Sequence, residues 1–401
     1  MDGIKVERDI SVPKEWDRKG LPSWSYFSPS LLELEKEYVF YNHWQIICHT
    51  SDIVKKGDFI TFDICSERIL VIRDNQGKVR AFNNLCRHRG SRVVVDEKGR
   101  CDALVCPFHG WVYNLDGSLR GPAKPKSFHK IDKKEFGLKK LDCEVWNGLV
   151  FVRLSKGSQP SVKTLMEPFS EELSHYKMDD MLPTNGIWTQ KSPVNWKSVR
   201  DVDNEGYHVA MAHPSLQDLY GKTYFDEPFV NGTSRTHATF NESGGRSWSV
   251  RNYKKISQPY FSLPEKLHKA WIYYGIFPNA VIAVTPESMQ FYQEFPISTK
   301  KTMLRGATYK YKNETRSQKL ARFLGSRIDQ DTIDEDVKLT IWSNESMSSK
   351  AFDGFYLSDL EYGIKSHHDH LRRLLPILNM ETKPKEKKIS KINKKLLSKI
   401  T

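Results

Sequence analysis

Two short stretches of the chain each hold one cysteine and one histidine. Cys86 and His88 form a C-x-H pair, and Cys106 and His109 form a C-x-x-H pair after seventeen intervening residues. These side chains suit a two-iron cluster in which one iron takes both thiolates and the other takes both imidazoles. Because neutral imidazoles replace two thiolates, such a cluster is less anionic and accepts an electron more readily. The pattern therefore predicts an electron-transfer centre.

The residues that follow each pair support this interpretation. Arg89–Gly90 follows the first pair and Gly110–Trp111 follows the second, and the whole pattern resembles the Rieske [2Fe–2S] motif. A structural zinc site is the alternative for two cysteines and two histidines. Zinc fingers, however, pair C-x-x-C with H-x(3–5)-H and do not mix the two ligand types in each half. We expect a [2Fe–2S] cluster bound by the four side chains.

A second group of chemically capable residues lies downstream, at Glu205, His208 and His213. Two positions five residues apart are about 140° apart around an α-helix, so both histidines bind one metal only if the helix ends or bulges between them. Pro214 favours an ending, because proline disfavours the α conformation at the residue before it. Taken alone, such a pair is also compatible with two partly buried histidines that bind nothing.

The segments that must position these groups differ along the chain. Strand and turn signals recur over residues 42–156, which predicts a small antiparallel β domain. Residues 157–380 carry further strand patterns, a charged helical pattern over 315–349 and a capping-box signature before a last helix ending near Leu375. Together these patterns predict an α+β fold with one antiparallel sheet flanked by helices. The strands expected in that sheet are 236–240, 248–251, 270–276, 280–284, 289–295 and 302–309.

The two ends of the chain differ from the rest in composition. Residues 1–41 read as an arm and a helix that packs on the C-terminal domain. From Glu381 to the last residue, eight lysines and two glutamates supply +6 of the net charge of +13. Such a lysine-rich terminus, residues 381–401, is expected to be a solvated and disordered tail. It has no aromatic residue to stack on bases, so we expect no nucleic-acid partner.

The overall composition of the chain excludes several other classes of protein. A hydrophobic content of 38% with 12% aromatic residues is enough for buried cores. No run of 18 apolar residues occurs, and no apolar segment follows Met1, so neither a membrane span nor a secretory signal is expected. Six cysteines in 401 residues are few, as in a cytoplasmic protein with reduced thiols.

Both motifs together resemble the catalytic α subunit of Rieske non-haem iron oxygenases, the ring-hydroxylating and demethylating family. The resemblance covers about residues 25–380 and rests also on Asn195–Trp196–Lys197 and on the Phe277–Pro278–Asn279 turn. It implies a mononuclear Fe(II) bound by two histidines and one carboxylate, with positions left open for O2. The domain that binds this iron is expected to have a helix-grip-like fold.

The resemblance also assigns the iron ligands. His208 and His213 match the two histidines of the family, and the third ligand comes from a helix far downstream. We choose Asp336 for this role, although Asp334 and Glu335 lie in the same acidic stretch and remain alternatives.

Glu205 takes the place of an acid, usually aspartate, that bridges two subunits in the family. That acid links a cluster histidine of one subunit to an iron-ligand histidine of its neighbour. A carboxylate between two imidazoles fixes their tautomers and offers a short path for the electron. The family is typically trimeric, so the resemblance implies a homotrimer.

The family reaction combines O2, two electrons and a C–H or C=C bond of a small substrate. The sequence has neither a G-x-G-x-x-G nucleotide loop nor a C-x4-C-x2-C ferredoxin pattern. A separate NAD(P)H-dependent flavin or iron–sulfur reductase is therefore implied. The basic surface of the chain would attract an acidic partner of this kind.

The resemblance also bears on the substrate. The chain as a whole is nearer to the choline, betaine and carnitine oxygenases than to the naphthalene type, which favours a methylated or quaternary amine. An aromatic ring or aromatic acid is the alternative, since aromatic side chains bind both. Two alternatives come from other functional classes. One is a Rieske-type electron carrier without mononuclear iron, and the other is a basic binding protein with structural zinc. The aromatic residues considered for the pocket are Tyr207, Tyr220, Tyr224, Phe225, Tyr273, Tyr274, Phe277, Phe291 and Tyr292.

Overall fold

The computed structural model describes residues 8–129, 131–155, 157, 159–257 and 263–399. By their internal contacts the residues form two compact units: Phe40–Lys163, and Met1–Val39 together with Thr164–Thr401. The predicted domain boundary at residue 156 and the first seven residues of the predicted arm lie outside the described residues. Both units contain antiparallel sheets and the larger one also carries helices, which confirms the predicted α+β class.

The smaller unit is built from three antiparallel sheets, two of which share one core. Leu70, Phe82, Trp111 and Tyr113 are buried together in this core, and the turns between strands bring the loops at Cys86 and Cys106 to it. The first sheet has the order β4 (Val79–Asn83), β3 (Glu67–Arg73), β2 (Asp58–Ile64) and β5 (Lys98–Arg100). The other two sheets are β6 (Leu104–Val105), β7 (Val112–Tyr113), β8 (Leu119–Gly121), and β1 (Gln45–His49), β10 (Leu149–Arg153), β9 (Asp142–Trp146).

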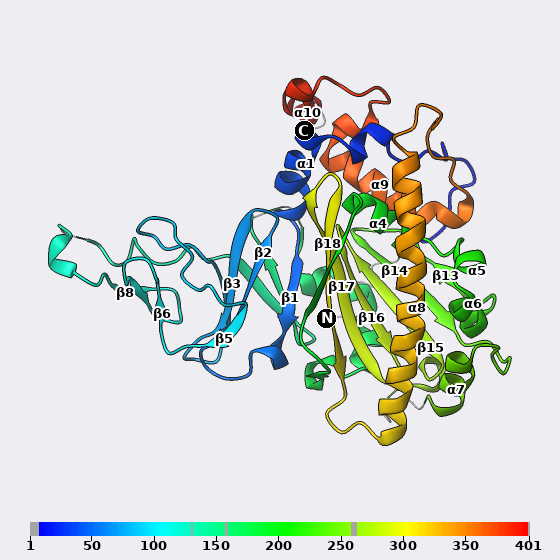
Figure 1. Ribbon diagram of the computed structural model, residues 1–401, viewed down its shortest axis with the longest axis horizontal. Coiled ribbons are helices and arrows are strands. Elements are labelled where there is room, and N and C mark those ends of the chain that lie inside the picture. Colours follow the sequence, from blue (N-terminus) through cyan, green and yellow to red (C-terminus); the bar gives the residue numbers. More distant parts are fainter. Residues whose placement is uncertain (1–7, 130, 156, 158, 258–262, 400–401) are drawn as a thin grey trace, which may run out of the picture. The chain divides into compact units, whose positions relative to one another are not determined.

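The larger unit contains one antiparallel sheet of eight strands (Figure 1). Its central strands are buried along almost their whole length, because both faces of the sheet are covered. The order is β11 (Leu182–Pro183), β18 (Lys301–Lys310), β17 (Ser288–Ser298), β16 (Ala280–Thr285), β15 (Ala270–Ile276), β14 (Thr233–Thr239) and β13 (Phe225–Asp226), and β12 (Trp188–Ser192) also pairs with β18.

One long helix, α8 (Arg316–Ser346), crosses a face of this sheet (Figure 1). Thr315 caps its first turn in a capping box with Gln318, and its 31 residues span about 46 Å. Three shorter helices contact it. The remaining helices are α1 (Pro29–Glu35), α2 (Val162–Leu165), α3 (Ser170–Ser174), α4 (Trp196–Asp203), α5 (Val209–Ala212), α6 (Pro214–Tyr220), α7 (Trp248–Ile256), α9 (Tyr362–Leu374) and α10 (Ile389–Leu397).

Helix α4 is tied to the N-terminal arm by a buried ion pair. Glu35, at the end of α1, accepts hydrogen bonds from Lys197 Nζ at 2.5 Å and from Trp196 Nε1 at 2.8 Å. Asn195 caps α4 by accepting from the backbone N–H of Lys197. The Asn–Trp–Lys motif therefore fixes the start of the helix that leads to His208.

The chain breaks at the second histidine of the downstream motif. Helix α5 is a single turn that ends at Ala212, and Pro214 begins α6. His213 between them has φ −120° and ψ 80°, outside the α region. The prediction that a helix ends between the two histidines is confirmed, because proline cannot follow a helical residue without strain.

The predicted strand at 248–251 is wrong. These residues begin α7, which Ser247 caps through a side-chain bond to the N–H of Val250. Four residues are too few to separate a strand from a helix by periodicity, and only the buried positions Ser249, Val250 and Tyr253 reveal the helical face.

The expectation of a disordered tail is also wrong for the described part of it. Helix α10 lies within residues 381–401, and it contacts α1. Ile389 and Asn393 are buried, and Asn393 accepts a hydrogen bond from the backbone N–H of Ile377. Lysines occupy the solvated face, while a few apolar residues at helical spacing hold the segment in place. Within the described chain, no helix combines the length and apolarity needed to cross a membrane.

Candidate metal centres

Two matching loops of the smaller unit present the predicted cluster residues. Each loop starts at a cysteine, and the glycine four residues later, Gly90 or Gly110, donates its N–H to the carbonyl of that cysteine at 2.9 or 3.0 Å. Both glycines have positive φ, +74° and +66°, which a side chain would strain. The C-x-H and C-x-x-H stretches thus fold as two tight turns.

The thiols and the imidazoles differ in exposure. Cys86 and Cys106 are buried, whereas His88 is half-buried and His109 is exposed. The rings of His88 and His109 have centroids 4.7 Å apart, and His88 stacks on Trp111. The sulfur end of the group therefore faces the core, and the nitrogen end faces the surface.

The surroundings of Cys86 and Cys106 support a role for the two thiols as a pair of metal ligands. Tyr113 Oη lies 3.3 Å from Cys86 Sγ. Burial raises the pKa of Cys86, the Tyr113 hydroxyl lowers it, and the neighbouring Cys106 thiol raises it further. Nδ1 of His88 is buried, yet it has no hydrogen-bond partner among the described residues. Two adjacent thiols and an unpartnered imidazole nitrogen fit a [2Fe–2S] cluster as ligands.

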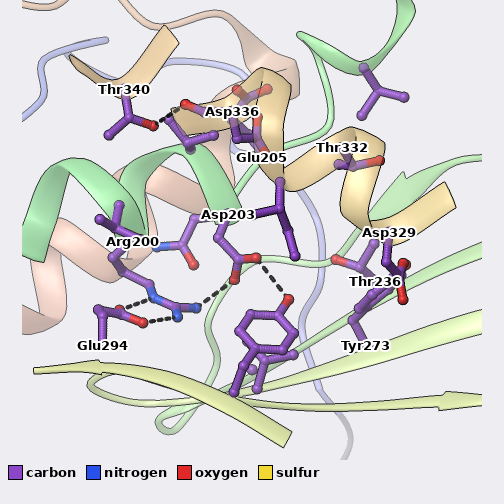
Figure 2. Close-up of a pocket in the computed structure, with 18 of the residues that line it drawn as sticks. Arg200, Asp203, Glu205, Thr236, Tyr273, Glu294, Asp329, Thr332, Asp336 and Thr340 are labelled. Carbon is purple, nitrogen blue, oxygen red and sulfur yellow. Dashed lines mark hydrogen bonds and ion pairs between the residues drawn. The ribbon is translucent and has the colours of Figure 1, made fainter. Parts of the chain in front are cut away.

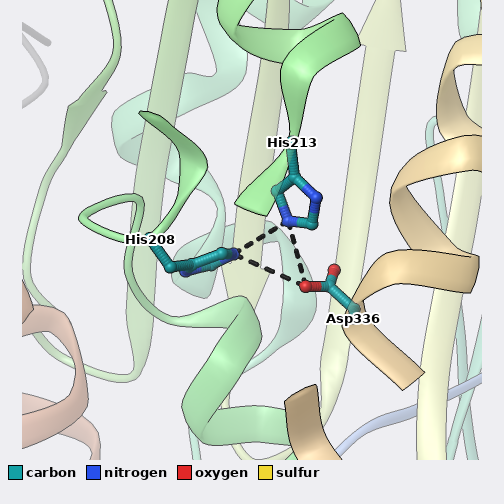
Figure 3. A group of neighbouring side chains, drawn as sticks. All are labelled: His208, His213 and Asp336. Atoms are coloured by element: carbon teal, nitrogen blue, oxygen red, sulfur yellow. Dashed lines mark hydrogen bonds and ion pairs between the residues drawn. The ribbon is translucent and has the colours of Figure 1, made fainter. Parts of the chain in front are cut away.

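In the larger unit, His208, His213 and Asp336 lie together (Figure 3). The Nε2 atoms of the histidines are 3.0 Å apart, and Asp336 Oδ1 lies 3.0 Å from that of His213 and 3.5 Å from that of His208. Two atoms at right angles around a metal, each about 2.1 Å from it, are separated by about 3 Å. The three atoms are therefore spaced as ligands on one side of a single ion.

Each of these histidines has a second carboxylate at its other nitrogen. Glu205 Oε1 lies 2.5 Å from Nδ1 of His208, and Glu335 Oε2 lies 2.9 Å from Nδ1 of His213. Such pairs orient a ligand imidazole and leave Nε2 free to bind metal. The sequence offered Glu335 as an alternative third ligand, but in the fold it contacts the opposite side of His213. Asp334 is exposed and accepts from Gln330.

The charge of the group would favour a cation. Burial lowers the pKa of His208, but Asp336 and Glu205 outweigh it and raise that pKa to about 10. Burial raises the pKa of Asp336, and the two imidazoles lower it to below its ordinary value. Two imidazoles, which are neutral when they bind a metal, and one carboxylate fit a mononuclear iron as a facial triad.

The triad opens into a cavity of about 250 Å³ between α8 and the sheet (Figure 2). The lining of the cavity is rich in tyrosine and in carboxyl groups. Four of the nine aromatic residues considered for the pocket line it, namely Tyr220, Tyr224, Tyr273 and Tyr292. The other five do not belong to the lining: Tyr207 and Phe225 are exposed, and Tyr274, Phe277 and Phe291 are buried.

A buried charge network forms one wall of the cavity. Arg200 of α4 donates two hydrogen bonds of 2.6 Å to Glu294 and one of 2.7 Å to Asp203 (Figure 2). Tyr292 Oη donates to the other carboxylate oxygen of Asp203 at 2.8 Å. Sequence reasoning missed this network, because Tyr292 and Glu294 lie on β17, far along the sequence from Arg200 and Asp203 of α4.

Comparison with known proteins agrees with this arrangement. Residues 43–139 match the family described as "Rieske [2Fe-2S] domain", and residues 177–377 match "Ring hydroxylating alpha subunit (catalytic domain)". A solved quaternary ammonium Rieske monooxygenase described in connection with carnitine oxidation has a TM-score of 0.74 and 22% identity, covering 91% of this chain and 100% of that one. At this identity the likeness shows the fold alone.

Two curated relatives resemble parts of the chain. The oxygenase subunit of glycine betaine monooxygenase from Pseudomonas aeruginosa (strain UCBPP-PA14) is 36% identical over 196 residues, which are 49% of this chain and 45% of that protein. Chloroplastic choline monooxygenase from Spinacia oleracea is 32% identical over 247 residues, 60% of this chain and 55% of that protein. The chain thus spans about half the length of these relatives.

The catalytic-domain match alone covers 201 of 401 residues, counted from 177 to 377, and it includes His208, His213 and Asp336. The cluster match includes Cys86 and His109. The chain therefore belongs to the Rieske non-haem iron oxygenase family, as an α subunit with a [2Fe–2S] domain and a catalytic domain of the class that binds mononuclear iron.

Proposed function

We propose that this chain is the terminal oxygenase component of an enzyme that hydroxylates a methylated amine, in particular a quaternary ammonium compound, and thereby removes a methyl group. The observation that carries the proposal is the placement of the two-histidine, one-carboxylate group at the wall of a small, tyrosine-lined cavity. The names of two curated relatives and of a structural neighbour refer to glycine betaine, choline and carnitine.

The geometry of the two sites supports the metal ligands that we propose. Cys86, His88, Cys106 and His109 bind the [2Fe–2S] cluster. The mononuclear iron would be held by His208, His213 and Asp336, whose Nε2 and Oδ1 atoms lie within 3.5 Å of one another. When bound, these groups would supply electron storage at the cluster and O2 activation at the iron.

The overall reaction balances for a quaternary amine. An N-methyl group of the substrate takes up one oxygen atom of O2, and two electrons and two protons convert the other oxygen atom to water. The organic product of this step is a carbinol, in which a hydroxymethyl group replaces the methyl group on the cationic nitrogen. The carbinol then breaks its C–N bond, and the electron pair of that bond stays on nitrogen. The final products are a tertiary amine, formaldehyde and one proton.

The cavity supports a small substrate. Its volume of about 250 Å³ is slightly below the range of about 300–1,000 Å³ typical of sites for drug-sized ligands. Burial raises the pKa values of Tyr220, Tyr224, Tyr273 and Tyr292, so their phenols stay neutral. Neutral tyrosine rings can bind an ammonium group through cation–π contacts.

The cavity lining also bears on the alternative of an aromatic substrate. An aromatic ring or aromatic acid would stack on the same tyrosines. A small benzoate-sized acid remains the second candidate, and product analysis separates it from an amine.

Electron delivery is proposed to cross between subunits of a homotrimer, with Glu205 as the bridge. Glu205 contacts the Nδ1 side of His208, away from the metal position. In the residues that follow it, Tyr207 and Met211 are 57% and 90% exposed, and Phe108, which precedes His109, is 54% exposed. Exposed apolar residues at both ends of the path are suited to a contact between copies. A separate NAD(P)H-dependent reductase would reduce the cluster.

A single-turnover experiment tests the proposal without the reductase. Protein with cluster and iron loaded is reduced by dithionite, freed of reductant, and exposed to O2 with choline, glycine betaine, carnitine or benzoate. Formaldehyde with a methylated amine, and none from the His208→Ala variant, supports the proposal. Hydroxylated benzoate without formaldehyde from any amine favours the ring oxygenase. No product at all, with a cluster that still cycles, favours the electron carrier.

A further inference from the structure

In the lining of the cavity beside the triad, acidic side chains outnumber basic ones. Among the described residues its lining holds no lysine and one arginine, Arg200. That guanidinium already binds Glu294 and Asp203, so it is not free for a substrate carboxylate. The carboxyl residues of the lining are Asp203, Glu205, Glu227, Glu294, Asp329 and Asp336.

Five of these carboxyl groups have partners within the protein. Asp203 and Glu294 bind Arg200, and Glu205 and Asp336 contact the histidines of the triad. The fifth, Glu227, lies 3.5 Å from Arg8 and 3.6 Å from Arg235.

Asp329 differs from the other five. Among the described residues it has no ion-pair partner, and its contact is with a neutral amide, Gln290 Nε2, at 3.4 Å. Burial raises the pKa of Asp329 to about 7, and the Gln290 amide lowers it only in part. A carboxyl group in this position lacks the cation that would stabilise its ionised form.

Aromatic rings surround the same end of the cavity. The charge of Asp329 contributes to the raised pKa values of Tyr273 and Tyr220, so both phenols lie near it. Their hydroxyl oxygens are 3.2 Å apart. Figure 2 shows Asp329 beside Tyr273 and Thr236 at one end of the cavity. A carboxylate next to neutral tyrosines is the chemistry that binds methylated ammonium groups.

Helix α8 sets the position of Asp329 relative to the triad. The residues of α8 that line the cavity recur every three or four positions, so they form one face of the helix. Asp329 and Asp336 lie on this face two turns apart, about 10.5 Å along the axis. A small ammonium group between them has the triad on one side and Asp329 on the other. The lining residues of this face are Asp329, Thr332, Ile333, Asp336, Val337 and Thr340.

We propose that Asp329 is the counter-ion of a cationic substrate, and that the site selects methylated ammonium compounds that carry no carboxylate. This inference rests on the proposed function and narrows its substrate class to cations such as choline. A zwitterion such as a betaine would bring a carboxylate into a cavity with six carboxyl groups and no free basic side chain among the described residues. Burial of that unpaired charge is costly.

Equilibrium binding tests the inference on the loaded protein under anaerobic conditions. Titration calorimetry compares choline, its neutral carbon isostere 3,3-dimethylbutan-1-ol, and glycine betaine. We expect choline to bind at least about tenfold more tightly than the other two. Asp329→Asn should weaken choline binding by about 10- to 100-fold and leave the neutral isostere within about twofold. The control Asp331→Asn, which alters an exposed acid of α8, should change neither.

Two outcomes would overturn the inference. One is glycine betaine binding as tightly as choline to the unaltered protein, a comparison that does not depend on how any variant folds. The other is a folded Asp329→Asn protein with unchanged choline affinity. A protein that demethylates betaines but not choline overturns this inference alone. A protein that binds choline yet demethylates no amine overturns the proposed function instead.

Discussion

Glu335 lies behind His213, with Oε2 of the carboxylate 2.9 Å from Nδ1 of the imidazole. The other nitrogen of the ring, Nε2, lies 3.0 Å from Oδ1 of Asp336. Two adjacent acids of α8 therefore contact the two nitrogens of one histidine. One acid faces the candidate iron position, and the other orients the ring toward it.

Replacement of Glu335 by glutamine should weaken Fe(II) binding by about 10- to 100-fold, because an amide holds the His213 tautomer less strongly. Anaerobic Fe(II) titration of protein with an intact cluster measures this affinity. Asp334→Asn is the matched control, since it removes the preceding carboxylate on the exposed side of the same helix. Equal affinity for both variants would show that Glu335 does not position the ligand.

Glu205→Gln should retain both metals and slow reoxidation of the reduced cluster by O2 and substrate by about tenfold or more. Glutamine can still accept a hydrogen bond from His208 Nδ1, but it loses the negative charge of the proposed bridge. Stopped-flow absorbance of the cluster gives the rate, and iron analysis gives the metal content. An unchanged rate would contradict the bridging role.

The ion pair between Glu35 and Lys197 should stabilise the larger unit. Both side chains are 1% exposed, so Glu35→Ala leaves a buried, unpaired ammonium group and should cost about 3–5 kcal/mol of unfolding free energy. Glu33→Ala removes the exposed partner of Lys36 on the same helix and should cost about 0.5 kcal/mol or less. Urea unfolding followed by tryptophan fluorescence compares the two, and equal losses would contradict the account.

Gly206→Ala should alter the substrate cavity, because a Cβ atom there would meet the ring of Tyr224, which lines the cavity. We expect weaker choline binding with an unchanged cluster spectrum. Gly186→Ala is the control, since nothing lies within 4 Å of its added Cβ. Unchanged binding in Gly206→Ala would mean that Tyr224 does not shape the site.

The sequence alone was sufficient for the features that depend on local spacing. The two cysteine–histidine turns, the break before Pro214 and the capping box of Ser358 and Glu361 each lie within a few residues. The contacts of Asp336 do not depend on local spacing, because Asp336 lies 123 positions after His213 in the sequence. Adjacent helical residues point about 100° apart, so only the placement of α8 distinguishes Asp336 from Glu335.

The wrong predictions have physical causes of the same kind. Residues 248–251 alternate in hydrophobicity, yet the cap at Ser247 and the contact of α7 with α8 make them helical. The composition of the tail, in which lysines dominate, predicts disorder. Burial of Ile389 against the rest of the unit nevertheless orders the helix. Tertiary contacts decided both segments.

The central claim is that one chain holds two separate iron sites, and metal analysis tests it most directly. Anaerobically purified protein should contain about three iron and two acid-labile sulfide per chain, with the EPR signal of a reduced Rieske cluster. Asp336→Ala should lose about one iron and keep the sulfide and the signal. Loss of the cluster in that variant, iron equal to sulfide even after added Fe(II), or zinc without sulfide would contradict the account.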